Sequence, residues 1–105
     1  MVSKGNATLT IKADSRQIIE NESIGFKCIL DGMDKSQINR LWWYKNDHLI
    51  EETLLKNARI DRANMALVLN DLSHHNDNGK YHCVIELKNS QNISSNQIDV
   101  ETKCN

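Results

Sequence analysis

The chain has 105 residues, of which 39% are hydrophobic and 26% are charged, and its formal net charge is −1. This size and composition are typical of one soluble globular domain, so we expect residues 1–105 to form a single domain with a core from about residue 8 to 102. The near-neutral charge argues against nucleic acid as a general partner. No apolar stretch approaches the roughly 18 residues of a membrane span.

The first five residues, Met1 to Gly5, are polar, and no apolar segment of a signal peptide follows them. We interpret them as the added start of an expressed fragment. The domain is then expected to come from a longer protein whose targeting signals and any membrane anchor lie elsewhere.

Alternating apolar residues predict six strands. In chain order they cover residues 8–11, 24–30, 41–45, 65–69, 81–87 and, more weakly, 96–100. The residues expected to face inward are Ile24, Phe26, Cys28 and Leu30, then Leu41 and Trp43, then Met65, Leu67 and Leu69, and finally Tyr81, Cys83, Ile85 and Leu87. Polar turn segments at 31–32, 45–47, 61–64 and 88–92 separate these strands. This spacing predicts an all-β sandwich.

Several segments resemble the immunoglobulin superfamily over about residues 20 to 100. They are Asn21 to Cys28, Trp43-Tyr44-Lys45-Asn46-Asp47, Leu67-Val68-Leu69 with Leu72, and Asp77-x-Gly79-x-Tyr81-x-Cys83. The resemblance implies an immunoglobulin-like sandwich of two sheets with Greek-key topology. The short spacing between the two cysteines favours an I-set or C2-like domain.

The resemblance also implies roles for core residues. Cys28 and Cys83 are expected to form a disulfide between the sheets, which would stabilise the fold by roughly 4 kcal/mol. Trp43 is expected to pack on it, and the hydroxyl of Tyr81 to bond the backbone upstream in a tyrosine corner. Gly79 is expected to allow a tight turn. Asp77 is expected to pair with Arg59.

The two adjacent tryptophans give the main functional lead. If Trp43 faces the core, alternation places Trp42 and Tyr44 on the opposite face of the strand. In the family this strand lies beside the last two strands. The outward positions of the three strands would be Arg40, Trp42, Tyr44, His82, Val84, Glu86, Gln97 and Asp99. Exposed aromatic side chains with charged neighbours are typical of protein interfaces.

Two alternatives compete with this interface. A neighbouring loop containing Leu49, Ile50, Leu54 and Leu55 could fold over the patch, or Trp42 rather than Trp43 could be the core residue. The match of Trp43-Tyr44-Lys45 to the family pattern argues against the second alternative.

Three N-x-S/T sequences begin at Asn6, Asn21 and Asn92. They are candidate N-glycosylation sites, and all three map to an exposed terminus or to predicted turns. The alternative is that they are ordinary turn asparagines.

We expect no enzyme activity, cofactor or metal. Adjacent residues such as His74 and His75 do not converge on one ion, and no other Cys/His cluster has zinc spacing. We expect these two histidines in an exposed turn, with His48 in another. The sequence has no nucleophile elbow or phosphate-binding loop.

The third cysteine, Cys104, is left over if Cys28 and Cys83 pair. It could bridge to a second chain, to a missing segment or to a following cysteine-rich module, or it could be a free thiol.

Two functions are therefore expected. The first is an extracellular recognition module of an adhesion, receptor or secreted protein, which binds a protein ligand or a second copy of itself. The second is a structural spacer in a chain of several such domains, including the intracellular muscle type with reduced cysteines. The three sequons and Cys104 favour the first function.

Overall fold

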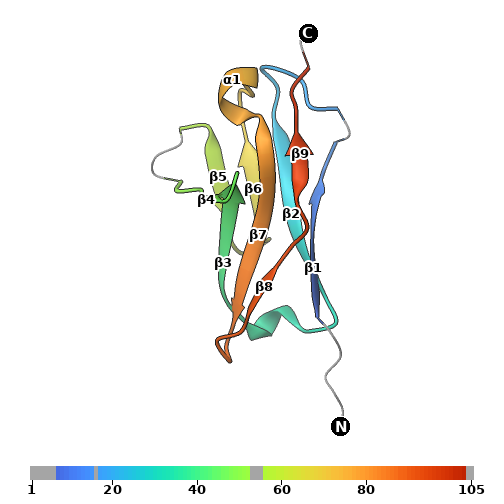
Figure 1. Cartoon of the computed structure of the whole chain (residues 1–105), viewed down its shortest axis with the longest axis vertical. Coiled ribbons are helices and arrows are strands. Elements are labelled where there is room, and N and C mark those ends of the chain that lie inside the picture. The colour runs from blue at the N-terminus through green and yellow to red at the C-terminus, as the bar shows by residue number, and fades with distance from the viewer. Residues whose placement is uncertain (1–6, 16, 53–55, 104–105) are drawn as a thin grey trace.

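The computed structural model describes residues 7–15, 17–52 and 56–103 (Figure 1). The order of elements is β1 (Thr8–Ala13), β2 (Ile24–Asp31), the 3-10 helix η1 (Lys35–Gln37), β3 (Ile38–Lys45), β4 (His48–Leu49), β5 (Ala58–Asp61), β6 (Ala66–Leu69), α1 (His74–Asp77), β7 (Gly79–Leu87), β8 (Asn92–Ser94) and β9 (Ile98–Val100).

These strands form two packed antiparallel sheets. The first has the order β1-β2-β6-β5, and the second has the order β4-β3-β7-β8 with β9 also paired to β7. In Figure 1, β7 runs down the middle of the second sheet, with β3 on one side and with β9 and β8 following each other along the other side. The predicted all-β sandwich of the immunoglobulin type is confirmed.

The core lies between the sheets and follows the predicted alternation. The side chains of Trp43, Leu67, Cys83 and Ile85 are fully buried. A disulfide joins Cys28 of β2 to Cys83 of β7, so the predicted bond between the sheets is confirmed. The rings of Phe26 and Tyr81 stack with their centroids 5.4 Å apart.

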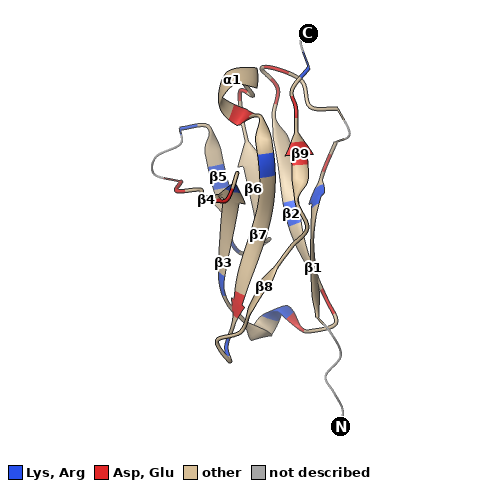
Figure 2. Ribbon diagram, viewed as in Figure 1, with Lys and Arg blue, Asp and Glu red and all other residues tan. Residues whose placement is uncertain are grey.

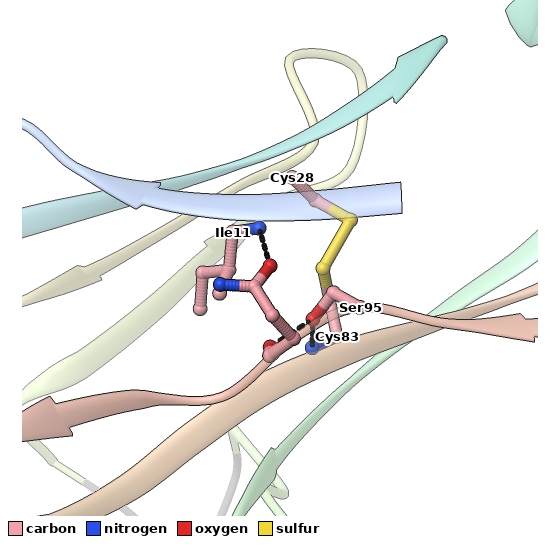
Figure 3. The surroundings of a disulfide bond; sticks show 5 residues. Ile11, Cys28, Cys83 and Ser95 are labelled. Carbon is pink, nitrogen blue, oxygen red and sulfur yellow. Dashed lines mark hydrogen bonds between the residues drawn. A yellow bond between two sulfur atoms is a disulfide. The ribbon is translucent and has the colours of Figure 1, made fainter. Parts of the chain in front are cut away.

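The link between β8 and β9 crosses next to this disulfide (Figure 3). The Ser95 hydroxyl accepts a hydrogen bond from the backbone N–H of Cys83 at 2.9 Å. The Asn96 side-chain oxygen accepts one from the N–H of Ile11 in β1 at 3.1 Å. The two residues therefore tie the edge of the second sheet to the first strand of the other sheet.

Three short strands, β4, β5 and β8, were not predicted. Residues 92–94 form β8 rather than the end of a turn, and His48 begins β4 rather than lying in one. The turn assigned to Asn92 was therefore wrong. β4 and β8 each contain a single apolar residue, Leu49 or Ile93, so neither shows a period of two over the length that a sequence pattern needs. β5 has only four residues, of which two are apolar.

Asp77 does not pair with Arg59, which corrects the expectation. Arg59 is exposed, because the neighbouring inward positions of β5 are taken by Ala58 and Ile60. The buried Asp77 carboxylate instead accepts hydrogen bonds from the side-chain nitrogen of Asn57, at 3.1 and 3.2 Å, and from the N–H of Ser73 at 2.8 Å.

The tyrosine corner has the geometry that the resemblance implied. The Tyr81 hydroxyl donates to the carbonyl oxygen of Asp77 at 2.7 Å. Burial and, to a smaller extent, the Asp77 carboxylate raise the pKa of this hydroxyl above its ordinary value. At Gly79, a Cβ would lie 2.9 Å from the side-chain nitrogen of Asn46, so this position has no room for a side chain.

Candidate functional site

The pairing of β3 with β7 fixes which tryptophan faces the core. Trp43 lies opposite Cys83 and is fully buried, whereas Trp42 lies opposite Val84 on the other face of the sheet and is half-buried. Since side chains alternate along a strand, Tyr44 shares the outer face with Trp42. The alternative register, with Trp42 in the core, is therefore wrong.

Five side chains form what we call the outer patch: Trp42, Tyr44, Leu49, His82 and Val84. Tyr44 lies opposite His82 of β7, and the two rings stack with centroids 5.1 Å apart and planes 10° apart. On its other side Tyr44 lies opposite Leu49, which is 47% exposed and is the one large hydrophobic side chain in the exposed class among the described residues. The patch thus extends across β4, β3 and β7.

Charged pairs lie at both ends of the outer patch. At one end Arg40 Nε lies 3.7 Å from Glu86 Oε1, which also accepts a hydrogen bond from the Asn39 side chain at 3.1 Å. At the other end Lys80 Nζ lies 3.2 Å from Asp99 Oδ1. Figure 2 shows that the middle of β3 and of β7, between these pairs, carries no Lys, Arg, Asp or Glu. An apolar centre with a charged rim is the usual composition of a protein interface.

Strand pairing places all of the predicted outward residues except Gln97 on this one face, and Gln97 lies just before β9, outside the paired residues. Arg40, Gln97 and Asp99 are exposed, and the five others are half-buried. The structure adds Leu49, Asn39 and Lys80 to the set. Leu49 could have been found from Asn46-Asp47, because two turn-forming residues between extended segments indicate a hairpin that brings the next residues alongside β3.

The loop that was expected to compete for this face is only partly described. Leu49 lies at the margin of the outer patch and leaves it open, while Ile50 is buried in the core. Leu54 and Leu55 lie outside the described residues.

A hollow of about 610 Å³ adjoins the outer patch along the free edge of β3. Trp42 and Arg40 line it on the strand, and Arg62 and Met65 line it on the turn between β5 and β6. This hollow offers a partner room for a side chain beside Trp42.

The remaining candidate residues lie away from the outer patch. His74 and His75 are exposed in α1 rather than in an irregular turn, and Asn78 Nδ2 lies 3.1 Å from His74 Nδ1. Within the described residues no group of three His, Cys, Asp or Glu side chains could hold a metal ion. In the same part of the chain, no helix has the length and apolar character needed to cross a membrane.

The candidate glycosylation sites differ in their surroundings. Asn21 is exposed in the turn before β2 and has a φ of 72°, the left-handed conformation that Asn tolerates. Asn92 is exposed at the start of β8. Asn6 and Cys104 lie outside the described residues.

Comparison with known proteins gives a family match and a set of structural neighbours. The model of the immunoglobulin I-set domain matches residues 7–100. No curated protein matches the sequence.

Three solved structures illustrate the likeness. Murine CEACAM1b superposes with a TM-score of 0.72 at 18% identity, over 93% of this chain and 44% of that chain. The full ectodomain of mouse nectin-like molecule 4 gives 0.71 at 16% identity, over 93% and 30%. The N-terminal Ig1-2 module of the Drosophila receptor protein tyrosine phosphatase DLAR gives 0.68 at 17% identity, over 91% and 47%. The chain thus spans less than half of each of these chains, and the likeness concerns the fold.

Proposed function

The chain belongs to the immunoglobulin I-set family, and from that premise we propose that it is an extracellular recognition module that binds a protein ligand or a second copy of itself through the outer patch. The parent would be an adhesion, receptor or secreted protein. Catalysis, cofactors, nucleic acid and direct membrane contact form no part of the proposal.

The stacked pair of Tyr44 and His82 beside Trp42 is the observation that carries this proposal. Aromatic side chains that are partly buried in the free domain lose little conformational freedom when a partner covers them. They also bury a large area each, which is why Trp and Tyr dominate interface energies. The charged pairs at both ends would then orient the partner rather than supply most of the affinity, because exposed ion pairs contribute little.

The extracellular location has separate support. A disulfide between the sheets persists in oxidising compartments and is rare in the cytosol. Two of the structural neighbours are described in extracellular terms, as the ectodomain of nectin-like molecule 4 and as extracellular domains of Drosophila OTK. An extracellular spacer domain would share the disulfide, but it would not need an exposed aromatic face without Lys, Arg, Asp or Glu.

The interface is tested with Trp42→Ala and Tyr44→Ala. We expect each to weaken binding by about 30-fold or more, because a central aromatic anchor contributes roughly 2 kcal/mol or more. The measurements are self-association by sedimentation equilibrium and binding of a fluorescent tetramer of the domain to a panel of cells.

Val68→Ala is the matched control, because Val68 is half-buried on β6 of the opposite sheet. It should leave binding unchanged. If wild-type binding is detected and both aromatic variants retain it with unchanged unfolding temperatures, the outer patch is not the interface.

A further inference from the structure

One of the candidate glycosylation sites lies on the same face as the outer patch. In the pairing of β7 with β8, Asn92 lies opposite Glu86 and Ser94 lies opposite Val84. Residues that lie directly opposite in an antiparallel pair point to the same side of the sheet. Asn92 and Ser94 are both exposed, while Ile93 between them packs against the core. The whole acceptor sequence therefore presents its polar side chains on the outer face.

The same register places Asn92 close to Trp42. Glu86 lies opposite Arg40, and Val84 lies opposite Trp42, so two strand spacings and two residues separate Asn92 from Trp42. With strands about 4.8 Å apart and a rise of about 3.4 Å per residue, the Cα atoms are roughly 12 Å apart. A branched oligosaccharide of several sugar rings is longer than this distance.

We propose that an N-linked oligosaccharide on Asn92 covers the Trp42 and Val84 end of the outer patch, so that occupancy of this site controls how much of the patch a protein partner can reach. In the modification the Asn92 amide nitrogen bonds to the anomeric carbon of an oligosaccharide carried on a lipid diphosphate. The lipid diphosphate leaves, and the amide loses one proton. This control of access rests on the proposed function, because covering Trp42 with a glycan affects binding only if the outer patch binds a partner.

The glycan would act on one end of the patch only. Tyr44, His82 and Leu49 lie further along β3, β7 and β4, toward the Lys80–Asp99 pair and away from β8. They would remain accessible when Asn92 is modified. The unmodified domain would present the full patch and the adjoining hollow, and the modified domain would present the Tyr44 end alone.

Asn21 provides an internal contrast. Its backbone N–H donates to the carbonyl of Leu72, and the Ser23 hydroxyl donates to Asn70, so this site lies between β2 and the segment that leads into α1. In Figure 1 that end of the sandwich is opposite to β8. A glycan on Asn21 would therefore leave the outer patch uncovered.

Fluorescence of the two tryptophans measures directly whether a glycan on Asn92 covers Trp42. Trp43 is fully buried and Trp42 is half-exposed, so quenching of tryptophan fluorescence by a bulky neutral nitroxide reports Trp42. The domain is secreted from mammalian cells behind a signal peptide, and mass spectrometry of the tryptic peptide covering residues 89–103 gives the occupancy of Asn92. We expect the site to be occupied and the quenching constant to rise at least twofold in Asn92→Gln.

Asn21→Gln is the matched control and should leave the quenching constant unchanged. An unmodified Asn92, or equal quenching in the glycosylated domain and in Asn92→Gln, would overturn the proposal. The two proposals fail separately. If Trp42→Ala abolishes binding while Asn92→Gln leaves quenching unchanged, the interface is supported and the covering of Trp42 by a glycan is wrong. If quenching rises in Asn92→Gln but Trp42→Ala binds normally, the covering of Trp42 by a glycan is supported and the interface is wrong.

Discussion

At the scale of single residues, Asp77 is the most constrained polar group of the fold. The residue is 5% exposed, Asn57 and Ser73 both donate to its carboxylate, and its carbonyl oxygen accepts from Tyr81. The sequence could indicate that this residue is structural, because the Asp-x-Gly-x-Tyr-x-Cys pattern marks the corner. It could not identify the partner, because that depends on which side of β5 each residue faces. Asn57 lies just before the strand and reaches inward, whereas Arg59 within the strand faces out.

Asn57→Ala is expected to lower the free energy of unfolding by about 1 to 3 kcal/mol, because it leaves a buried carboxylate with fewer donors. It also removes the hydrogen bond from Asn57 to the carbonyl of Asn70. Arg59→Ala is the control and should change stability by less than about 0.5 kcal/mol. Urea unfolding of the two variants measures both values. A larger loss in Arg59→Ala than in Asn57→Ala would show that the arginine is the real partner of Asp77.

At the scale of elements, β3 shows what alternation can and cannot predict. The strand is long enough for its period of two to assign Trp43 to the core and Trp42 to the outside, which is how the outer patch was found. β4 and β8 contain two and three residues, so neither displays a period, and their pairing with β3 and β7 is set by turn geometry and by the core. Those short strands contribute Leu49 to the patch and Asn92 beside it. The margin of the site was therefore the part that the sequence predicted least well.

The hairpin between β3 and β4 carries strain that a single change can relieve. Its two turn residues, Asn46 and Asp47, have φ values of 51° and 65°. The Asn46 side chain is engaged, because its oxygen accepts from the N–H of Lys80 at 3.0 Å. A two-residue turn with positive φ at both positions favours Gly at the second. We therefore expect Asp47→Gly to raise stability by about 0.5 kcal/mol, or roughly 3 °C in unfolding temperature.

Asn46→Gly is the comparison for this hairpin. It gains the same relief of about 0.5 kcal/mol but loses the hydrogen bond to Lys80, which contributes about 0.5 to 1.5 kcal/mol, so it should destabilise the domain by up to about 1 kcal/mol. Thermal unfolding followed by far-ultraviolet circular dichroism separates the two effects. If Asp47→Gly lowers the unfolding temperature, the carboxylate of Asp47 has a stabilising role that the turn geometry does not explain.

At the scale of the whole molecule, the two sheets contribute differently. The four-stranded sheet and the disulfide complete the core, while the outer face of the five-stranded sheet carries the outer patch. The Cys28–Cys83 bond joins the two sheets at the middle of β7, and the hydrogen bond from Ile11 to Asn96 joins β1 to the link between β8 and β9, which Ser95 in turn holds against Cys83 (Figure 3). The five-stranded sheet that carries the outer patch is therefore fixed to the other sheet through its inner face, so the aromatic side chains lie on a rigid support.

The redox state of this bond links the fold to the cellular location. Closing a loop with a sequence separation of 55 residues stabilises the domain by about 4 kcal/mol in the chain-entropy treatment. Cys28→Ala/Cys83→Ala should lose about that amount in urea unfolding and should also loosen the packing around Trp43. Differential alkylation of the parent protein from its natural source, followed by mass spectrometry of the peptides of this domain, should label Cys28 and Cys83 only after reduction. A Cys104→Ser variant, secreted from cells, should show no free thiol before reduction. Free thiols at Cys28 and Cys83 in the unreduced natural protein would place the domain in a reducing compartment and would overturn the extracellular proposal, while leaving the fold and the outer patch as they are.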